Sequence, residues 1–315
     1  MADRAVALYV GNALAAYGFP DQHPFAPGRH DAFWREVQRR GLDRRVQIRT
    51  PVQASRAAIE RFHSAAYVER VIQASNDGVG YLDAGDTPAF VGIYEASATV
   101  VGSTIDAVDA VMSGSAQRAF VPIAGLHHAS RDSAAGFCVF NDCGVAIESL
   151  RSQHGVRRVL YVDIDAHHGD GVYYAFADDP DVLIADLHED GRFLYPGTGF
   201  AHETGRGPAA GSKLNLPLLP LADDDRFFKV WASIEEFLAD RPFDFVLFQC
   251  GADSLRHDPL TQLHFTAQAH AHAASRLCEI ADARCQGRIV ALGGGGYDLA
   301  NIAAGWCAVL EAFVA

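Results

Sequence analysis

Short runs of β-branched and aromatic residues alternate along this chain with longer segments whose apolar residues recur every three or four positions. That alternation is typical of a parallel sheet flanked by helices, so it predicts an α/β fold. We expect strands at residues 5–10, 119–124, 158–164, 182–187, 244–250 and 288–293. We expect helices at residues 93–113, 141–153, 223–239, 266–285 and 298–313. Asn141 should cap the second of these helices, and Asp223 to Asp225 should lie at the positive end of the third.

The domain organisation follows from length and uniformity. The chain has 315 residues, of which 49% are hydrophobic, and this is enough for a sizeable core. We find no internal repeat, low-complexity tract or Pro/Gly/Ser linker. We therefore predict a single domain spanning residues 1–315.

The charge of the chain limits the partners that it can bind, and its cysteine content indicates the cellular compartment. With 39 acidic and 26 basic side chains, the formal net charge is -13, which would repel nucleic-acid phosphates and anionic lipid. We expect no nucleic-acid or membrane partner, no transmembrane helix and no signal peptide. The cysteines form no C-x-x-C pair and fit reduced thiols of a cytoplasmic protein. They are Cys138, Cys143, Cys250, Cys278, Cys285 and Cys307.

Chemically active residues concentrate in the segments that follow five of the predicted strands. These segments read "GLHHAS", "DAHHGDG", "HEDGRFLYPGTG", "GADSLRHDP" and "GGGGYD". In open α/β sheets, ligands bind outside the carboxyl ends of the strands. The sequence therefore predicts a functional site at that edge of the sheet.

The segment "DIDAHHGD" indicates a metal site. Asp165 and His167 are two residues apart, so in extended backbone they project to the same side. A catalytic zinc takes three protein ligands and keeps one position open, and Asp253 is the best third candidate because it also follows a buried strand. A His and two carboxylates accept ferrous iron as well as zinc. The alternative for each aspartate alone is a helix cap.

Asp163 adds a further charge beside this group. It lies on the same side as Asp165, and two unscreened carboxylates so close together would not both stay ionised. We therefore expect a second, monovalent cation bound by oxygen atoms near Asp163.

The adjacent imidazoles of His127 and His128 are candidates for general acid and base catalysis. Imidazoles titrate in the right range, and Asp163 and Asp170 are possible carboxylate partners that would orient them. The alternatives are structural core histidines or further metal ligands.

Tyr297 follows four glycines at the end of the last predicted strand. Close approach of the backbone there would let the phenol donate to an oxyanion opposite the metal. A flexible turn is the alternative, and no G-x-x-x-x-G-K-[ST] motif supports a phosphate-binding loop.

Taken together, these motifs resemble the zinc-dependent histone deacetylase family and its bacterial acetylpolyamine and acetoin-utilisation relatives. The resemblance covers nearly the whole chain, through "HPFAPGRH", "GLHHASRDSAAGFCVFND", "YVDIDAHHGDG", "YPGTG", "GADSLRHDPL" and "GGGGYDLANIAAGW". It implies the arginase–deacetylase fold, with a central, mostly parallel, eight-stranded sheet.

The resemblance also implies roles for individual residues. The family's zinc ligands match Asp165, His167 and Asp253, its tandem histidines match His127 and His128, and its transition-state tyrosine matches Tyr297. Its structural potassium site matches Asp163, Asp165, His167 and Asp186, where many members have Ser in place of Asp186. The walls of its acyl-lysine tunnel match Gly136, Phe137 and Tyr195. Arg29 matches the arginine of an inner pocket for the departing acid, and Asp86, with Asp83 as the second choice, matches the carboxylate at the rim.

The expected function is therefore metal-dependent hydrolysis of an acylated amine, with an acyl-lysine peptide or protein as substrate. Leu260 occupies a rim position that is apolar in lysine deacetylases and Glu in the acetylpolyamine branch. Glu189 and Asp190 could still supply a counter-charge for a polyamine. A dimanganese ureohydrolase and a non-catalytic acyl-binding protein are further alternatives, and the chain could form a homo-oligomer.

Overall fold

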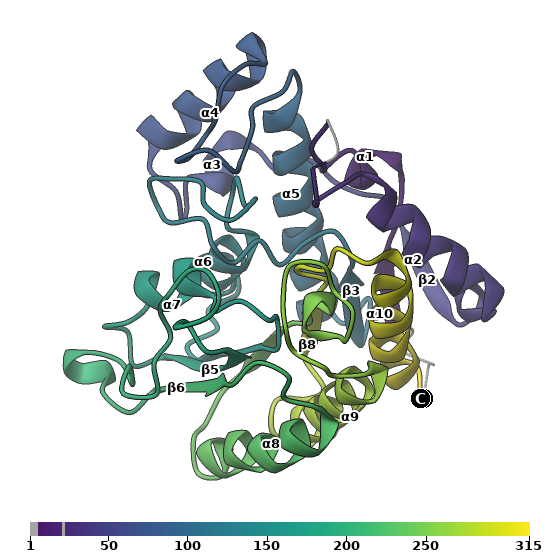
Figure 1. Ribbon diagram of the computed structural model, residues 1–315, viewed down its shortest axis with the longest axis vertical. Helices are drawn as coiled ribbons and strands as arrows, with labels where there is room; N and C mark the ends of the chain where they lie inside the picture. The colour runs from purple at the N-terminus through teal and green to yellow at the C-terminus, as the bar shows by residue number, and fades with distance from the viewer. Residues whose placement is uncertain (1–5, 21–22) are drawn as a thin grey trace.

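A computed structural model describes residues 6–20 and 23–315 of the chain (Figure 1). Its centre is one sheet of eight strands, and every neighbouring pair of strands is parallel. The strand order is β2-β1-β3-β8-β7-β4-β5-β6. The predicted α/β fold with a mostly parallel eight-stranded sheet is confirmed, and the sheet is parallel throughout.

All six predicted strands are present, and Ala5 of the first prediction lies outside the described residues. They are β1 (Val6–Tyr9), β3 (Arg118–Val121), β4 (Val159–Asp163), β5 (Val182–Glu189), β7 (Phe245–Gln249) and β8 (Ile289–Leu292). The sequence reading missed β2 (Val46–Arg49) and β6 (Lys213–Leu218), the two edges of the sheet. Pro217 within β6 is compatible only with an edge position, because proline cannot donate to a second neighbour.

The five predicted helices are also present. They are α5 (Ile93–Met112), α6 (Asp142–His154), α8 (Asp224–Leu238), α9 (Ala267–Arg284) and α10 (Leu299–Phe313). Asn141 caps α6 by accepting from the Gly144 amide, and Asp223 caps α8 by accepting from the Arg226 amide.

Several further elements were not predicted. They are α1 (Asn12–Ala15), α2 (Gly28–Arg39), α3 (Arg56–Ile59), α4 (Ala65–Asp77) and α7 (Asp170–Ala175), together with single 3₁₀ turns at Leu42–Arg44, Gly207–Ala209 and Ala252–Ser254. None of the helices in the described part of the chain is long and apolar enough to cross a membrane.

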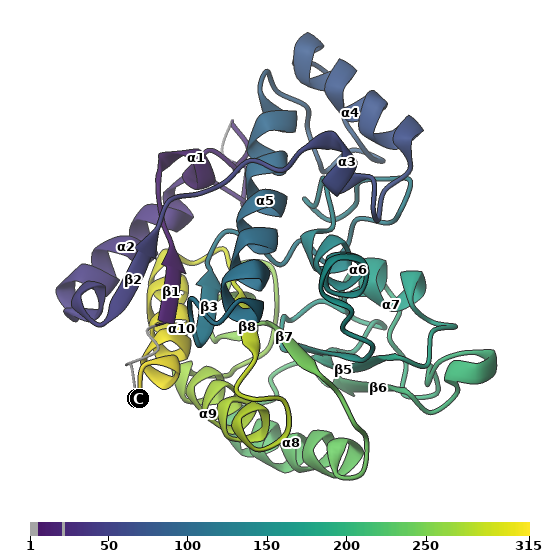
Figure 2. The ribbon, with the colours of Figure 1, turned by 180° about the vertical axis from the view of Figure 1, so that it is seen from behind.

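Helices cover both faces of the sheet (Figures 1 and 2). On one face, α5 packs against β1, β3 and β8, and α6 lies beside α5. On the other, α9 packs against β7 and β8, α8 packs against β6, and α10 lies between α9 and α2. The central strands are fully buried between these layers, and the six cysteines are buried as free thiols.

The topology places the chemically active loops side by side. Strands β3, β8, β7 and β4 are consecutive neighbours in the middle of the sheet. The loops with His127 and His128, Tyr297, Asp253, and Asp165 with His167 follow these four strands. Because the strands are parallel, all four loops leave the same edge of the sheet.

Candidate active site

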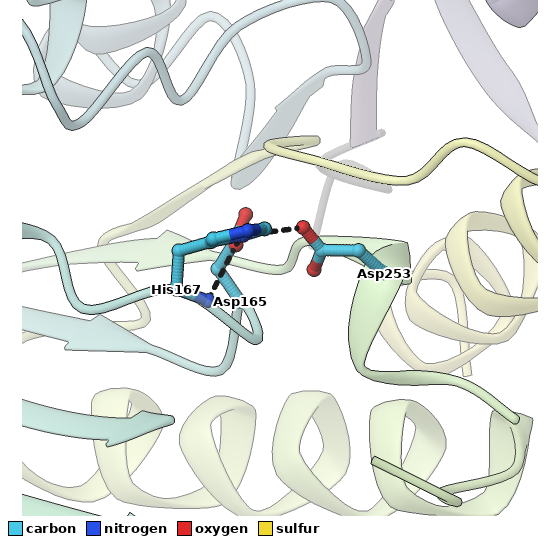
Figure 3. A group of neighbouring side chains, drawn as sticks. All are labelled: Asp165, His167 and Asp253. Carbon is cyan, nitrogen blue, oxygen red and sulfur yellow. Dashed lines mark hydrogen bonds and ion pairs between the residues drawn. The ribbon is translucent and has the colours of Figure 1, made fainter. Parts of the chain in front are cut away.

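Asp165, His167 and Asp253 converge at the carboxyl end of the sheet (Figure 3). The Nδ1 atom of His167 lies 3.1 Å from Asp165 Oδ1 and 3.0 Å from Asp253 Oδ2. One ligand atom from each residue lies within 4.8 Å of the other two, and all three residues are buried. Across residues 6–20 and 23–315 this is the one such group of potential metal ligands. We call these three residues the metal-ligand triad.

The electrostatics of the triad favour a bound cation. Two buried carboxylates face one imidazole, and burial together with the charge of Asp165 raises the pKa of Asp253 to about 7. Burial alone would lower the pKa of His167, but the carboxylates of Asp165 and Asp253 outweigh it and raise that pKa to about 10. The excess negative charge of such a cluster is stabilised by a divalent ion.

The spacing of the triad also fits zinc. With zinc–ligand bonds of about 2.0–2.1 Å and tetrahedral angles, neighbouring ligand atoms lie about 3.3 Å apart. The two observed separations, 3.0 and 3.1 Å, need only a small expansion to match. The residues present therefore fit a three-ligand site for zinc or ferrous iron.

His127 and His128 lie directly beside the triad, and each has its own carboxylate partner. His127 Nδ1 is 2.8 Å from Asp163 Oδ2, and His128 Nδ1 is 2.7 Å from Asp170 Oδ1. Because carboxylates only accept, both Nδ1 atoms carry a proton. The two Nε2 atoms are 3.1 Å apart, so the charge of one imidazole acts directly on the other.

The surroundings favour a positive charge on His127. Burial disfavours it, but Asp163 and Asp165 outweigh burial and raise the pKa of His127 to about 10. Burial and the neighbouring charge of His127 lower the pKa of His128 to about 4. His128 is therefore the neutral imidazole of the pair, with Nε2 as a free base.

Tyr297 lines the same cavity as Asp165 and His167 of the triad and the two histidines. Its main-chain amide donates to Asp258 Oδ2 over 2.8 Å, which fixes the loop that carries it. Burial and the charge of Asp253 raise the pKa of Tyr297 well above its usual value, so the phenol stays protonated. Asp258 was missed in the sequence reading, although it lies in the quoted motif "GADSLRHDPL".

Arg29 lies below this cavity, against the glycine loop before Tyr297. Its Nε donates to the Gly296 carbonyl over 2.8 Å, and its guanidinium carbon lies 3.8 Å above the Phe25 ring. The side chain is buried, and its Nη1 atom has no hydrogen-bond partner in the described part of the chain. A buried guanidinium with one unused nitrogen can bind a small anion.

Asp163 and Asp186 face each other across β4 and β5, where they are register partners. Asp186 accepts from the Gly169 amide over 2.9 Å and pairs with His188 Nδ1 over 2.6 Å. Asp163 accepts from the Asp165 amide and from the Tyr161 hydroxyl. The two residues form a second buried group of oxygen atoms beside the triad.

A family model for the histone deacetylase domain matches residues 23–313 of the chain. The chain belongs to the histone deacetylase family. The deacetylase is 38% identical to the acetoin utilization protein AcuC of Bacillus subtilis (strain 168), over 90% of this chain and 75% of that protein. It is 31% identical to histone deacetylase clr6 of Schizosaccharomyces pombe, over 96% of this chain and 75% of that protein.

A solved structure shows the same fold. The HD domain of HDA15 superposes on the deacetylase with a TM-score of 0.91 at 25% identity, covering 98% of this chain and 89% of that one. Together, the family match and these relatives establish the chain as a deacetylase, which is a hydrolase of amide bonds.

Aromatic rings surround the approach to the deacetylase's triad. The Tyr195 ring lies 5.2 Å from the His128 ring and 6.4 Å from the His167 ring, between centroids, and Phe137 lies 5.8 Å from Tyr297. Gly136 has φ 54°, and a Cβ there would overlap the His128 ring. The three residues predicted as tunnel walls thus lie around the histidines and Tyr297, and glycine is required at position 136.

At the rim, the structure separates the two candidate carboxylates. Asp83 accepts from the amides of Gly85, Asp86 and Thr87, so its oxygens are committed to its own loop. Both Asp83 and Asp86 line an open basin of about 660 Å³ that Tyr195 also borders. Asp86, whose pKa is raised to about 6 by burial and by Asp83, has the freer carboxylate.

The other predicted rim residues differ from one another. Leu260 is 39% exposed, as a rim residue should be. Glu189 is buried and accepts from the Gln262 amide over 2.8 Å, and Asp190 is buried and paired with Arg192 over 2.6 Å. Asp190 is thus engaged, whereas Glu189 Oε1 has no hydrogen-bond partner in the described part of the chain, so a counter-charge from this pair stays a prediction.

Proposed function

We propose that this deacetylase is a zinc-dependent amide hydrolase that removes an acetyl or other short acyl group from an acyl-lysine side chain. The observation that carries the proposal is the convergence of Asp165, His167 and Asp253 beside the adjacent imidazoles of His127 and His128. Ferrous iron is the alternative metal, because the ligand set accepts both ions.

Asp165, His167 and Asp253 would hold a zinc ion, which would supply a Lewis acid to polarise the amide carbonyl and to acidify a water molecule. His128, neutral at Nε2, accepts the proton of the attacking water and later protonates the leaving amine. His127, held by Asp163, carries the neighbouring positive charge, and Asp170 orients His128. Water thus adds to the carbonyl carbon, the C–N bond breaks, and a carboxylic acid and a free amine leave.

Tyr297 and Arg29 complete this account. The protonated phenol of Tyr297 donates to the carbonyl oxygen as negative charge develops on it. Arg29, with its unused nitrogen behind the glycine loop, binds the departing carboxylate.

The substrate follows from the approach to the triad. Gly136, Phe137 and Tyr195 suit an apolar, extended acyl-lysine chain, and Leu260 offers no charge to a polyamine. Asp86 would accept hydrogen bonds from a peptide backbone at the rim. An acetylpolyamine is the second candidate, because Asp83 and Asp86 both line the rim basin.

One panel tests the proposal. Zinc-loaded protein would be incubated with acetyl-lysine peptides, acetylputrescine and acetylspermidine, and the released acetate measured. We expect the peptides to give the highest kcat/KM. A higher kcat/KM for the polyamines would make an acetylpolyamine the substrate in place of acyl-lysine. Turnover of guanidine compounds with two manganese ions would indicate a ureohydrolase. Binding of acyl ligands without turnover would indicate a non-catalytic acyl-binding protein.

We also propose that potassium binds beside the triad, at Asp163, Asp165, His167 and Asp186. No hydrogen-bond donor among the described residues reaches the main-chain carbonyls of Asp165 and His167, and two carboxylates lie nearby. An ion at ten times its Kd would add about 1.4 kcal/mol of stability, and so about 2 °C in melting temperature.

The measurement compares melting in potassium chloride and in tetramethylammonium chloride at equal ionic strength. Asp186→Ser is the matched variant, because it removes the Asp186–His188 pair. Stabilisation of this variant alone would show that the pair takes the place of the ion in the natural chain.

Four expectations from the sequence stay predictions. They are a single domain, a cytoplasmic location, a homo-oligomer, and a partner that is neither nucleic acid nor a membrane.

A further inference from the structure

The last residue of β7, Gln249, lies at the centre of the four loops that form the site. Its side chain is fully buried and does not reach solvent, and its Nε2 lies 3.3 Å from His127 Nδ1. It was not among the residues that the sequence singled out, although it lies only two residues before the quoted segment "GADSLRHDP".

Three hydrogen bonds hold the Gln249 amide in one orientation. Its Oε1 accepts from the Gly251 amide over 2.8 Å. Its Nε2 donates to Asp165 Oδ2 over 2.8 Å and to the Gly125 carbonyl over 3.2 Å. Because an amide N–H can only donate and a carbonyl can only accept, the reversed orientation would lose all three bonds.

These bonds join loops that are far apart in the sequence. Gly125 begins the loop of His127 and His128, and Gly251 begins the turn of Asp253. The fourth loop is also in contact, because a Cβ at Gly294 would overlap the Gln249 amide. Gly294 has φ 70°, so a side chain there would also strain the backbone.

The bond to Asp165 has a specific consequence for the triad. Asp165 Oδ1 lies 3.1 Å from His167 Nδ1 and faces the metal position. Asp165 Oδ2 points away and accepts from Gln249 and from the Gly295 amide, both over 2.8 Å. Two donors on Oδ2 fix the rotation of the carboxylate, while Oδ1 accepts one hydrogen bond, from the His167 amide over 3.0 Å, and is the oxygen that faces the position of an ion.

We propose that Gln249 is a positioning residue that holds the metal ligand Asp165 in register with the loops of His127 and Asp253. It touches neither substrate nor the reacting atoms. Its function is to keep one Asp165 oxygen on the metal while the loop that carries the general base stays at a fixed distance. The proposal rests on the proposed zinc site.

The experiment compares Gln249→Met and Gln249→Asn with Cys250→Ala. Methionine keeps the length but removes all three hydrogen bonds, and asparagine keeps the amide but is one methylene too short to reach Asp165. Cys250 is the matched control, because it is the next residue of the chain, is equally buried, and its thiol donates to the Leu292 carbonyl instead of to the site.

Zinc affinity would be measured by competition with a chromophoric chelator, together with melting of the metal-free protein and kcat and KM for an acetyl-lysine peptide. We expect both Gln249 variants to bind zinc about 10- to 100-fold more weakly and to lose kcat by a similar factor. KM should stay within about twofold, because Gln249 does not reach the approach to the triad. Cys250→Ala should lower the melting temperature but leave zinc affinity unchanged.

A folded Gln249 variant with zinc affinity and kcat within about twofold of the natural chain would overturn the proposal. So would an equal loss of zinc affinity in Cys250→Ala, since the effect would then be general damage to β7. If Gln249→Met does not fold, Gln249→Asn decides. Failure of the natural chain itself to bind zinc or to hydrolyse amides would instead contradict the proposed function, so the two failures are distinguishable.

Discussion

The site contains two histidine–aspartate pairs that look alike in the sequence but differ in their surroundings. The His127–Asp163 pair is closed off, with side-chain exposures of 3% and 0%. In the His128–Asp170 pair, the Asp170 side chain is 20% exposed and borders an open pocket of about 410 Å³. The imidazole and the carboxylate are at nearly the same distance in both pairs, but the two pairs lie in different electrostatic environments.

This difference explains why the two pairs can have different tasks. The charges of Asp163 and Asp165 stabilise a protonated His127, whereas burial and the nearby His127 charge keep His128 neutral. One imidazole thus becomes a fixed positive charge and the other a base. Chemical identity alone does not assign a role to either residue, because neighbouring charges and burial do so.

The largest expected difference between the pairs is in turnover. His128→Ala removes the proposed base, and we expect kcat to fall by about 10²- to 10⁴-fold. The measurement is steady-state hydrolysis of an acetyl-lysine peptide by zinc-loaded protein. Zinc content serves as the control and should not change, because neither imidazole belongs to the triad. A larger loss in His127→Ala than in His128→Ala would reverse the assignment.

The next difference is in stability. Asp163 accepts from the Asp165 amide and the Tyr161 hydroxyl and pairs with His127, all in the core. Replacing one partner of a buried charged pair costs about 3–5 kcal/mol, so Asp163→Asn should lower the free energy of unfolding by about that amount. Asp170→Asn should cost about 1 kcal/mol, because Asp170 is partly exposed and makes one such contact. Urea unfolding of the metal-free variants measures both. Equal costs would show that burial does not distinguish the pairs.

The smallest difference concerns pH. The charge of His127 is the second cause, after burial, of the lowered pKa of His128. In His127→Gln that contribution disappears, so the pKa of His128 rises. Because the base acts when it is neutral, the acidic limb of kcat/KM should move to higher pH, by about one unit. A profile that stays in place, or moves to lower pH, would argue against electrostatic coupling between the imidazoles.

Much of the fold could be read from the sequence because its central strands are continuous apolar runs. The segments around Val159–Asp163 and Phe245–Gln249 are buried on both faces, and such strands have a clear signature. The edge strands β2 and β6 do not, since Val46–Arg49 is half-exposed and Lys213–Leu218 contains Pro217 and alternates in burial. The amphipathic helix α2 was also missed.

The candidate site was partly predictable for a similar reason. Aspartate, histidine and tyrosine side chains that follow buried strands stand out, so the triad, the two imidazoles and Tyr297 could be named. Gln249 and Asp258 could not, because their roles depend on main-chain amides and carbonyls from distant loops. A sequence shows which side chains carry chemistry, but it does not show which ones hold the loops in place.

The most direct test of this account is zinc binding by the natural chain and by Asp253→Asn, followed by chelator competition. The natural chain should bind one zinc per chain in the triad. The variant should bind zinc more than about 100-fold more weakly, because loss of a ligand must weaken zinc binding more than loss of a residue that only supports a ligand. Asp258→Asn, in the same loop but outside the triad, should keep its zinc. Equal zinc affinity in the natural chain and Asp253→Asn would contradict the claim that these three side chains share one ion.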